Sequence, residues 1–174
     1  MGKRISLLVV VSILAAGVAA FAQNIVPKVD GTVEPSEYAQ TYTDNGVVIS
    51  SQVTPDRIYM AITAPGDGWV ALGLGSSVMN GATIFMGYVD TNGKPEITVQ
   101  KGRFHTHSEF SGETPIAQAV GESNGKTTLE IAINRADFLD AGQKTMNYIF
   151  AYNKSAKDFR TRHTFRNSST LKIE

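Results

Sequence analysis

Apolar and polar residues alternate with a period of two along much of the chain, a pattern that predicts β-strands. The clearest run is Ile58–Thr63, which ends where Pro65 and Gly66 interrupt it. We expect strands in this and the other β-rich runs, which are 47–53, 58–63, 69–74, 83–89, 96–100, 116–120, 127–133, 147–152, 161–165 and 170–173. Turns separate the runs at intervals of about 8–12 residues, a spacing typical of a β-sandwich or barrel.

Turn-forming residues mark the ends of these strands. Asp90–Gly93 and Glu122–Gly125 each end in an Asn-Gly pair, which suits a tight turn because both residues tolerate positive φ. One short helical turn is expected at 135–140, with Asn134 as its N-cap and Gly142 after its end. The pattern predicts an all-β, immunoglobulin-like antiparallel β-sandwich with one short helical turn.

The N-terminus follows a different pattern from the strands. A basic pair precedes the apolar run Ile5–Phe21, and an A-x-A cleavage site ends at Ala22. This layout is typical of a secretory signal peptide, which we place at 1–22, with a single domain at 23–174. The alternative is an uncleaved membrane anchor, but the run is short for a spanning helix and lacks a basic stop-transfer cluster. We therefore expect an exported protein, periplasmic or extracellular, without a stable membrane anchor.

Charge and cysteine content exclude several partners and cofactors. The chain has 16 basic and 16 acidic residues, and without Lys3 and Arg4 the balance is 14 to 16. Nothing in this balance favours nucleic acid as a partner. The chain has no cysteine, which excludes disulfides, thiolate metal sites, Fe–S clusters and covalently attached haem. We find no nucleophile elbow, P-loop, dinucleotide fingerprint or zincin motif, and therefore expect a binding module rather than an enzyme.

Met79 lies in a Gly/Ser/Asn-rich loop between the predicted strands 69–74 and 83–89. Such a loop offers little apolar support for a core methionine. A thioether is a soft donor that suits haem iron, so Met79 is a candidate ligand. The alternative is a methionine that folds inward to fill a gap in the core.

The surroundings of Met79 resemble the signature of the DOMON domain family. That signature reads G-W-h-A-h-G-h and then M-x-G-[AS]-D before a hydrophobic strand, where h is hydrophobic. This signature is matched by Gly68–Leu74, Met79 and Gly81–Asp90, except that Thr83 stands in place of the Asp. The tail 162–173 is similar to the closing segment of the family, H-x-x-R-G, with Asn for the final Gly. The opening Asp-Gly and Glu-Tyr pairs of the family are also present near residues 30–38, so the resemblance covers the mature chain.

The resemblance implies a β-sandwich with a pocket for haem or a sugar. Haem-binding members ligate the iron with the loop Met and the C-terminal His, which correspond to Met79 and His163 here. It therefore implies an exported electron-transfer domain that holds haem b non-covalently and serves a redox partner protein not yet identified. We expect aromatic walls and propionate-pairing arginines near the pocket, and the candidates are Trp69, Phe85, Tyr88, Tyr152, Phe165, Arg162 and Arg166.

Other interpretations stay open. A carbohydrate-binding module of the same fold would stack sugar rings on Trp69 and on tyrosines, and a third option is a structural or ligand-sensing domain. His163 is alternatively a surface histidine among arginines. Residues i and i+2 of a strand share a face, so His105, His107 and Glu109 form an alternative zinc or copper site. His105 or His107 is also an alternative to His163 as the second haem ligand beside Met79.

Overall fold

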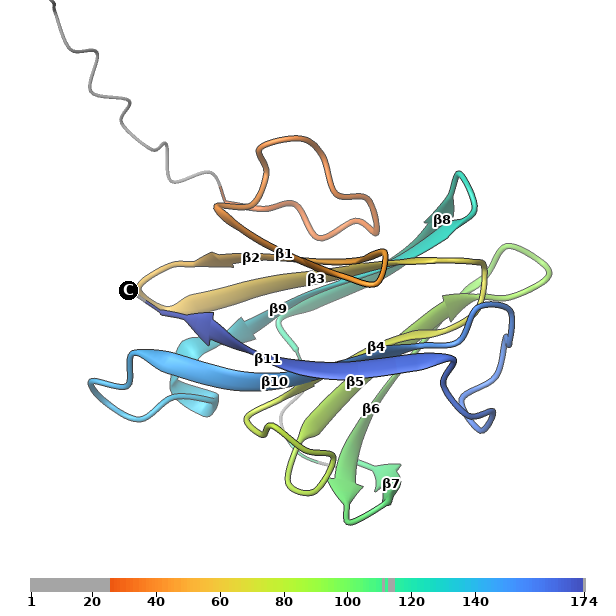
Figure 1. Ribbon diagram of the computed structural model, residues 1–174. Helices are drawn as coiled ribbons and strands as arrows, with labels where there is room; N and C mark the ends of the chain where they lie inside the picture. Colours follow the sequence, from red (N-terminus) through yellow and green to blue (C-terminus); the bar gives the residue numbers. More distant parts are fainter. Residues whose placement is uncertain (1–25, 111, 113–114, 174) are drawn as a thin grey trace, which may run out of the picture.

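Two antiparallel β-sheets face each other in the computed structural model, which describes residues 26–110, 112 and 115–173 (Figure 1). The predicted signal peptide at 1–22 lies outside these residues. Within them the only helical segment is one 3-10 turn, η1 (Arg135–Asp137), and no helix is long and apolar enough to cross a membrane. The predicted antiparallel β-sandwich with a short helical turn is confirmed.

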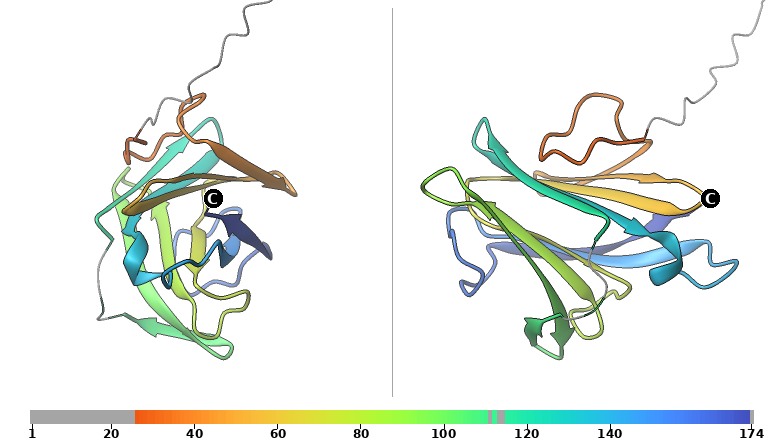
Figure 2. Two further views of the ribbon diagram at one scale, coloured as in Figure 1. Left: turned by 90° about the vertical axis from the view of Figure 1, so that its left-hand side faces the viewer. Right: turned by 180° about the vertical axis from the view of Figure 1, so that it is seen from behind.

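The two sheets have five and six strands (Figure 2). The five-stranded sheet has the order β1-β2-β3-β9-β8, and its strands are β1 (Gln40–Asp44), β2 (Val47–Val53), β3 (Arg57–Pro65), β9 (Lys126–Asn134) and β8 (Ala117–Ser123). The six-stranded sheet has the order β11-β10-β4-β5-β6-β7, and its strands are β11 (Phe165–Lys172), β10 (Thr145–Tyr152), β4 (Val70–Leu74), β5 (Thr83–Val89), β6 (Pro95–Arg103) and β7 (Thr106–Glu109).

Two predicted turns differ in construction. In the β8–β9 hairpin both Asn124 and Gly125 have positive φ, at 52° and 67°, as the Asn-Gly pair predicts. The turn after β5 is built differently, because only Gly93 of its pair has positive φ. There the carboxylate of Asp90 accepts hydrogen bonds from the amides of Asn92 and Lys94, both at 2.8 Å, so a side chain organises the turn.

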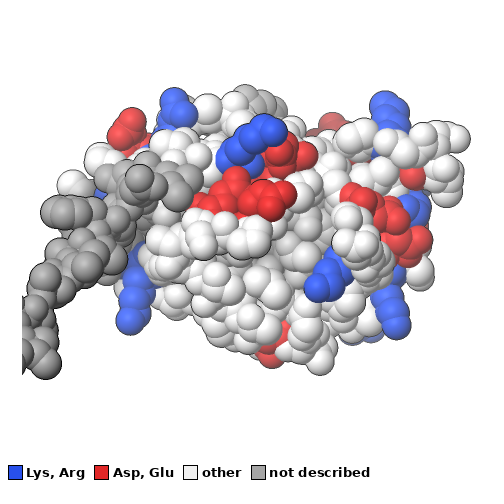
Figure 3. All heavy atoms as spheres, turned by 90° about the horizontal axis from the view of Figure 1, so that it is seen from above, with Lys and Arg blue, Asp and Glu red and all other residues white. Residues whose placement is uncertain are grey.

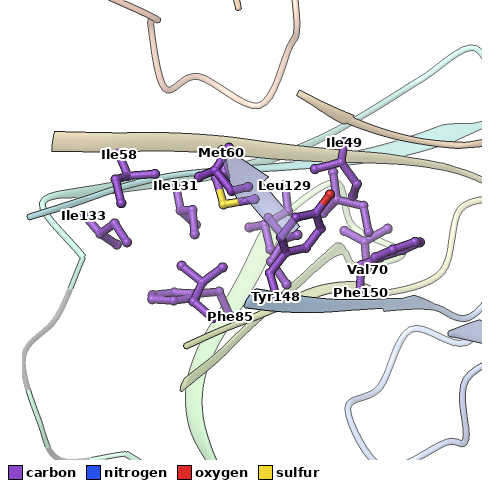
Figure 4. Packing of buried hydrophobic residues seen from close by; sticks show 14 of the residues in the cluster. Ile49, Ile58, Met60, Val70, Phe85, Leu129, Ile131, Ile133, Tyr148 and Phe150 are labelled. Atoms are coloured by element: carbon purple, nitrogen blue, oxygen red, sulfur yellow. The ribbon is translucent and has the colours of Figure 1, made fainter. Parts of the chain in front are cut away.

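The main core lies between the two sheets and takes one side of each strand. Its largest fully buried side chains include Met60 of β3, Ile131 of β9, and Phe85 and Phe150 of the facing sheet (Figure 4). Full burial of one such side chain stabilises the fold by about 1.5–3 kcal/mol. Because side chains alternate along a strand, the neighbours of these residues in the six-stranded sheet point away from the core.

The outer face of the six-stranded sheet is apolar as well. Strand register places Ile149, Gly73 and Ile84 in one row across β10, β4 and β5, and Ala151, Ala71 and Met86 in the next. A sheet face in contact with water is ordinarily polar. Here a second buried cluster forms on the outer face, and side chains of the β4–β5 and β10–β11 loops pack against it. This covered outer face is where the candidate site lies.

The N-terminal segment packs on the outer face of the opposite sheet. The fully buried carboxylate of Glu130 accepts hydrogen bonds from the three consecutive amides of residues 30–32, at 2.7–3.1 Å, and from the Tyr38 hydroxyl at 2.6 Å. Burial raises the pKa of Glu130 above its ordinary value. Lys and Arg side chains are interspersed with Asp and Glu over this side of the molecule (Figure 3).

Candidate cofactor-binding site

A cavity of about 970 Å³ lies on the outer face of the six-stranded sheet. Its floor consists of outward side chains of β4, β5 and β10, and its rim comes from the β4–β5 loop, the β6–β7 hairpin and the β10–β11 loop. The volume is near the upper end of the range of about 300–1,000 Å³ that cofactor sites occupy. The cavity is therefore large enough for an organic cofactor.

The floor is level because its central side chains are short. Gly73 lies between the larger Ile149 and Ile84, and in the next row Ala151 and Ala71 lie beside Met86. A Cβ atom at position 73 would lie 2.5 Å from Cγ1 of Ile149, too close for any real contact. Glycine is thus needed for the two strands to present this floor without displacing Ile149.

Met79 lies in the β4–β5 loop and lines the cavity, where its side chain packs against the outer-face cluster. Its carbonyl accepts a hydrogen bond from the Ala82 amide at 3.1 Å. Two further backbone bonds fasten the loop to β6, from the Gly81 amide to the Gly102 carbonyl at 3.1 Å and from the Gly102 amide to Ala82 at 2.9 Å. A Cβ at position 102 would overlap the Met79 carbonyl oxygen, so this approach requires glycine. Met79 is therefore held at the cavity by an anchored loop and does not fill the core between the sheets.

His163 enters the same cavity from the β10–β11 loop. Hydrogen bonds fix the backbone on both sides of it. The Arg162 carbonyl accepts from the side-chain amide of Asn153 at 2.7 Å, and the Thr164 amide donates to the Tyr152 carbonyl at 2.7 Å. Because β4 and β10 are antiparallel, the loops that carry Met79 and His163 leave opposite ends of the sheet, and each reaches the cavity from its own end.

The charge state of His163 suits a metal ligand. Partial burial, together with the positive charges of Arg166 and Arg162, lowers the pKa of His163 below its ordinary value of 6.5. The imidazole is consequently neutral at pH 7, which is the form that coordinates iron.

Trp69 is a predicted wall residue that does line the cavity. It is buried, and its indole N–H donates to the Thr161 carbonyl at 3.2 Å, which ties the β10–β11 loop to the sheet. Tyr88 packs against the outer-face cluster and lies beside Phe159, with 4.8 Å between the ring centroids, but it does not line the cavity. Phe159 does line the cavity and is absent from the sequence prediction, since it belongs to a loop without periodic pattern.

Three predicted wall residues lie elsewhere. Phe85, Tyr152 and Phe165 point to the core side of the six-stranded sheet and pack in the cluster between the sheets. None of the three lines this cavity. Phe85 lines a smaller cavity of about 490 Å³ instead. The physical reason is register, because the strand neighbours Ile84, Ala151 and Arg166 take the outward positions.

The arginines predicted to lie near the pocket do so. Arg162 and Arg166 line the cavity, and so does Arg160, which was not predicted. All three are exposed, and no Asp or Glu is found among the described residues that line the cavity. The site is thus an apolar floor with a positively charged side.

The predicted zinc or copper site is wrong. His105 and His107 both line the cavity, but His105 lies in the turn of the β6–β7 hairpin rather than in β7, so strand alternation does not place it beside His107. Nδ1 of His107 is hydrogen-bonded to Oε1 of Gln100, and Glu109 is not at the cavity. Within the described part of the chain no three His, Cys, Asp or Glu side chains form a metal-binding group.

Known structures share this architecture, although a scan against protein-family models and a search of curated proteins give no match. The cytochrome b domain of pyranose dehydrogenase from Coprinopsis cinerea aligns with a TM-score of 0.59 and 14% identity, over 76% of this chain and 80% of that one. The cytochrome domain of cellobiose dehydrogenase from Myriococcum thermophilum aligns with a TM-score of 0.55 and 7% identity, over 78% and 81%. Both are cytochrome domains, and this chain shares their fold at low identity, so the architecture expected from the family resemblance is confirmed at the level of the fold.

Proposed function

We propose that this protein is an electron-transfer domain that binds haem b non-covalently, with Met79 and His163 as the axial ligands of the iron. The observation that carries the proposal is their convergence: two side chains from separate loops line one cavity of about 970 Å³. The cytochrome domains that share the fold support the cofactor class.

The residues of the cavity fit haem chemically. A thioether and a neutral imidazole are established axial donors to haem iron. The apolar floor, which includes Trp69, Ile84 and Met86, suits the porphyrin, and Arg162 and Arg166 are placed to form charge-assisted hydrogen bonds with propionates. Because the chain has no cysteine, its hold on haem is non-covalent and reversible.

This ligand set favours electron transfer over catalysis. Bound haem would supply a one-electron ferric–ferrous couple. If Met79 and His163 both held the iron, the protein would leave no coordination position open for oxygen or peroxide. The Met79 thioether raises the reduction potential, and the buried floor, which keeps water away, also tunes it. The role is that of an electron carrier.

Export belongs to the same proposal. The signal-peptide pattern at 1–22 supports it, and a periplasmic or extracellular location follows if the segment is cleaved. A carrier in that location needs a redox partner protein.

Sugar binding has less support. Trp69, the expected stacking platform, is 4% exposed, with its indole edge tied to Thr161. Little of this ring is open to a sugar, and no Tyr is found among the described residues that line the cavity, so it offers few platforms for stacking sugar rings.

Haem titration with ligand variants tests the proposal. Purified apoprotein should bind one equivalent of haem and give a low-spin, six-coordinate spectrum with sharp α and β bands on reduction. Met79→Leu should open a coordination position and lower the potential, because the ferrous state loses its thioether ligand. His163→Ala should release haem more than tenfold faster, a change of at least about 1.4 kcal/mol.

Matched controls make the assignment specific. Met146→Leu changes a methionine of the inter-sheet core, and His105→Ala changes a histidine that shares the cavity; neither should alter the spectrum. If His105→Ala or a His107 variant removes the low-spin spectrum while His163→Ala does not, the imidazole ligand is misassigned. Absence of any spectral change on adding haem would end the proposal.

A further inference from the structure

The β10–β11 loop carries His163, and its two halves are held in different ways (Figure 1). The first half is docked on the segment before β4 by backbone hydrogen bonds. The Asn153 amide donates to the Trp69 carbonyl at 2.8 Å, and the Trp69 amide donates to the Ala156 carbonyl at 3.0 Å. A Cβ at Gly68 would lie 2.3 Å from the Asn153 carbonyl oxygen, so this close approach requires glycine. The sheet therefore fixes the first half directly.

Side chains fix the second half of the loop, which returns to the start of β11. The carbonyl of Thr161 accepts a hydrogen bond from the Trp69 indole at 3.2 Å. The next carbonyl, that of Arg162, accepts from the side-chain amide of Asn153 at 2.7 Å. This carbonyl belongs to the same planar peptide unit as the backbone nitrogen of His163. The Asn153 bond therefore fixes the peptide plane that leads directly into His163.

Asn153 is the side chain that joins the two halves. Its Oδ1 accepts from the amides of Ser155 and Ala156, at 3.0 and 2.7 Å, and its Nδ2 donates to Arg162. One planar amide thus connects the docked half of the loop to the peptide before His163. Asn153 is half-buried and is not among the described residues that line the cavity. It can therefore act on a cofactor only through the loop.

We infer that Asn153 is a positioning residue, which presents His163 to the cavity before a cofactor binds. The inference rests on the proposed function, because it names a further residue on which ligation of the iron by His163 depends. A ligand that is already oriented by a second side chain loses little conformational freedom when it coordinates. Without this link the loop would have to be ordered at the expense of haem affinity.

Backbone dynamics of the apoprotein test the positioning without haem. Asn153→Ser keeps an acceptor oxygen for the turn amides but is too short to reach Arg162. Asn153→Asp keeps the length and replaces the donor with an acceptor. We expect an NMR order parameter of about 0.85 for the His163 amide in the wild type, as in rigid backbone, and a fall toward about 0.6 in both variants. Because Ser adds no charge, agreement of the two variants excludes an effect of charge alone.

Haem ligation gives the second readout. Each Asn153 variant should release haem to excess apomyoglobin roughly two- to tenfold faster than the wild type, as expected for the loss of one hydrogen bond, and should show a high-spin fraction. Free imidazole should restore the low-spin spectrum of the variants at a concentration that leaves the wild type unchanged, because the iron lacks only a nitrogen ligand. A general loss of packing would not be rescued in this way.

Gln143→Glu is the matched control. Gln143 makes the same pair of bonds in the loop before β10, where its Oε1 accepts from the Asp140 amide at 3.1 Å and its Nε2 donates to the Thr145 carbonyl at 2.6 Å. It is half-buried, like Asn153, and no described residue between β9 and β10 lines the cavity. Gln143→Glu should leave the order parameter of His163, the rate of haem release and the spectrum unchanged.

The outcomes separate this inference from the proposed function. If the Asn153 variants keep the wild-type order parameter at His163, or behave like Gln143→Glu when loaded with haem, Asn153 does not position the ligand. A wild-type protein that gives no low-spin spectrum with haem would instead refute the proposed function. The order parameters of the apoprotein would still decide whether Asn153 holds His163 in place.

Discussion

Under the proposed function, the protonation state of His163 sets the conditions under which the cavity would hold iron. Its neighbours Arg162 and Arg166 and its partial burial all disfavour the imidazolium form, so the pKa of His163 lies below 6.5. Protonation competes with iron for the same nitrogen lone pair. In the proposed site the two arginines therefore have two roles. Their charge favours the neutral form of His163, and their N–H groups are donors for the haem propionates.

Haem retention should therefore resist mild acid. Well above the ordinary pKa of 6.5 the imidazole is neutral in both folded and unfolded chains, so retention stays constant there. Between 6.5 and the lowered pKa only the unfolded chain takes up the proton, which reduces folding stability as pH falls. Haem would be lost only at a pH below the lowered pKa, because bound iron competes with the proton for the imidazole nitrogen. Transfer of haem to excess apomyoglobin over a pH series measures this, and replacing both Arg162 and Arg166 with Gln should move the transition to higher pH.

At the scale of elements, β6 positions the β4–β5 loop, which carries the proposed ligand Met79. Gly102 exchanges backbone hydrogen bonds with the loop and leaves the space that the Met79 carbonyl occupies. A Cβ at position 102 would also lie 3.2 Å from Cγ of Met79, so Gly102 makes room for both the backbone and the side chain of Met79.

Gly102→Ala should displace Met79 without touching the cavity floor. We expect the ferric charge-transfer band of the Met–iron bond to weaken and the reduction potential to fall, because the ferrous state loses thioether ligation. Gly87→Ala is the control: its Cβ would meet Leu129 and Val120 in the core at 3.1–3.2 Å, away from the loop. It should lower the melting temperature and keep the band. If Gly102→Ala leaves the ferric charge-transfer band unchanged, Gly102 does not position Met79.

Elements were predictable from sequence where one face is buried. β2 and β5 match their predicted ranges residue for residue, whereas β1 and β7 were not predicted because nearly all their side chains are exposed or half-buried, so no apolar alternation marks them. The predicted strand 161–165 is largely wrong, because residues 161–164 belong to the β10–β11 loop. Phe165 begins one strand, β11, which continues to Lys172 through an exposed middle and includes most of the predicted 170–173.

The cavity was less predictable than the strands. Alternation divides the side chains of β5 into two sets, but both sets are apolar and nothing local tells which set faces the other sheet. Phe85 was therefore placed at the pocket and Ile84 was not, the reverse of what the structure shows. Met79 and His163 were found through their resemblance to a family pattern, and their shared cavity depends on strand order, which the sequence does not contain.

At the scale of the whole molecule, the two outer faces have different tasks. One carries the cavity. On the other packs the N-terminal segment, which is fastened by Glu130 in the middle of β9. Stability and binding therefore depend on residues on opposite sides of the sandwich.

Glu130→Ala should destabilise the fold strongly. It leaves three amides and the Tyr38 hydroxyl without their acceptor, and unsatisfied buried groups cost about 1–3 kcal/mol each, so a loss of about 3 kcal/mol or more is expected. Glu130→Gln keeps one oxygen for the amides and should cost about 1 kcal/mol. Urea unfolding measures both. The haem spectrum of Glu130→Gln should be unchanged, and an altered spectrum would show that the faces are coupled.

The level floor of Ala71, Gly73 and Ala151 has a consequence for the speed of redox exchange. These side chains have no torsions to adjust, and the strands beneath them are locked by ladder hydrogen bonds and by the packed layer behind. If haem is bound there as proposed, few side-chain atoms beneath it can reorient when its charge changes. A rigid floor of this kind would keep the reorganisation energy of electron transfer small.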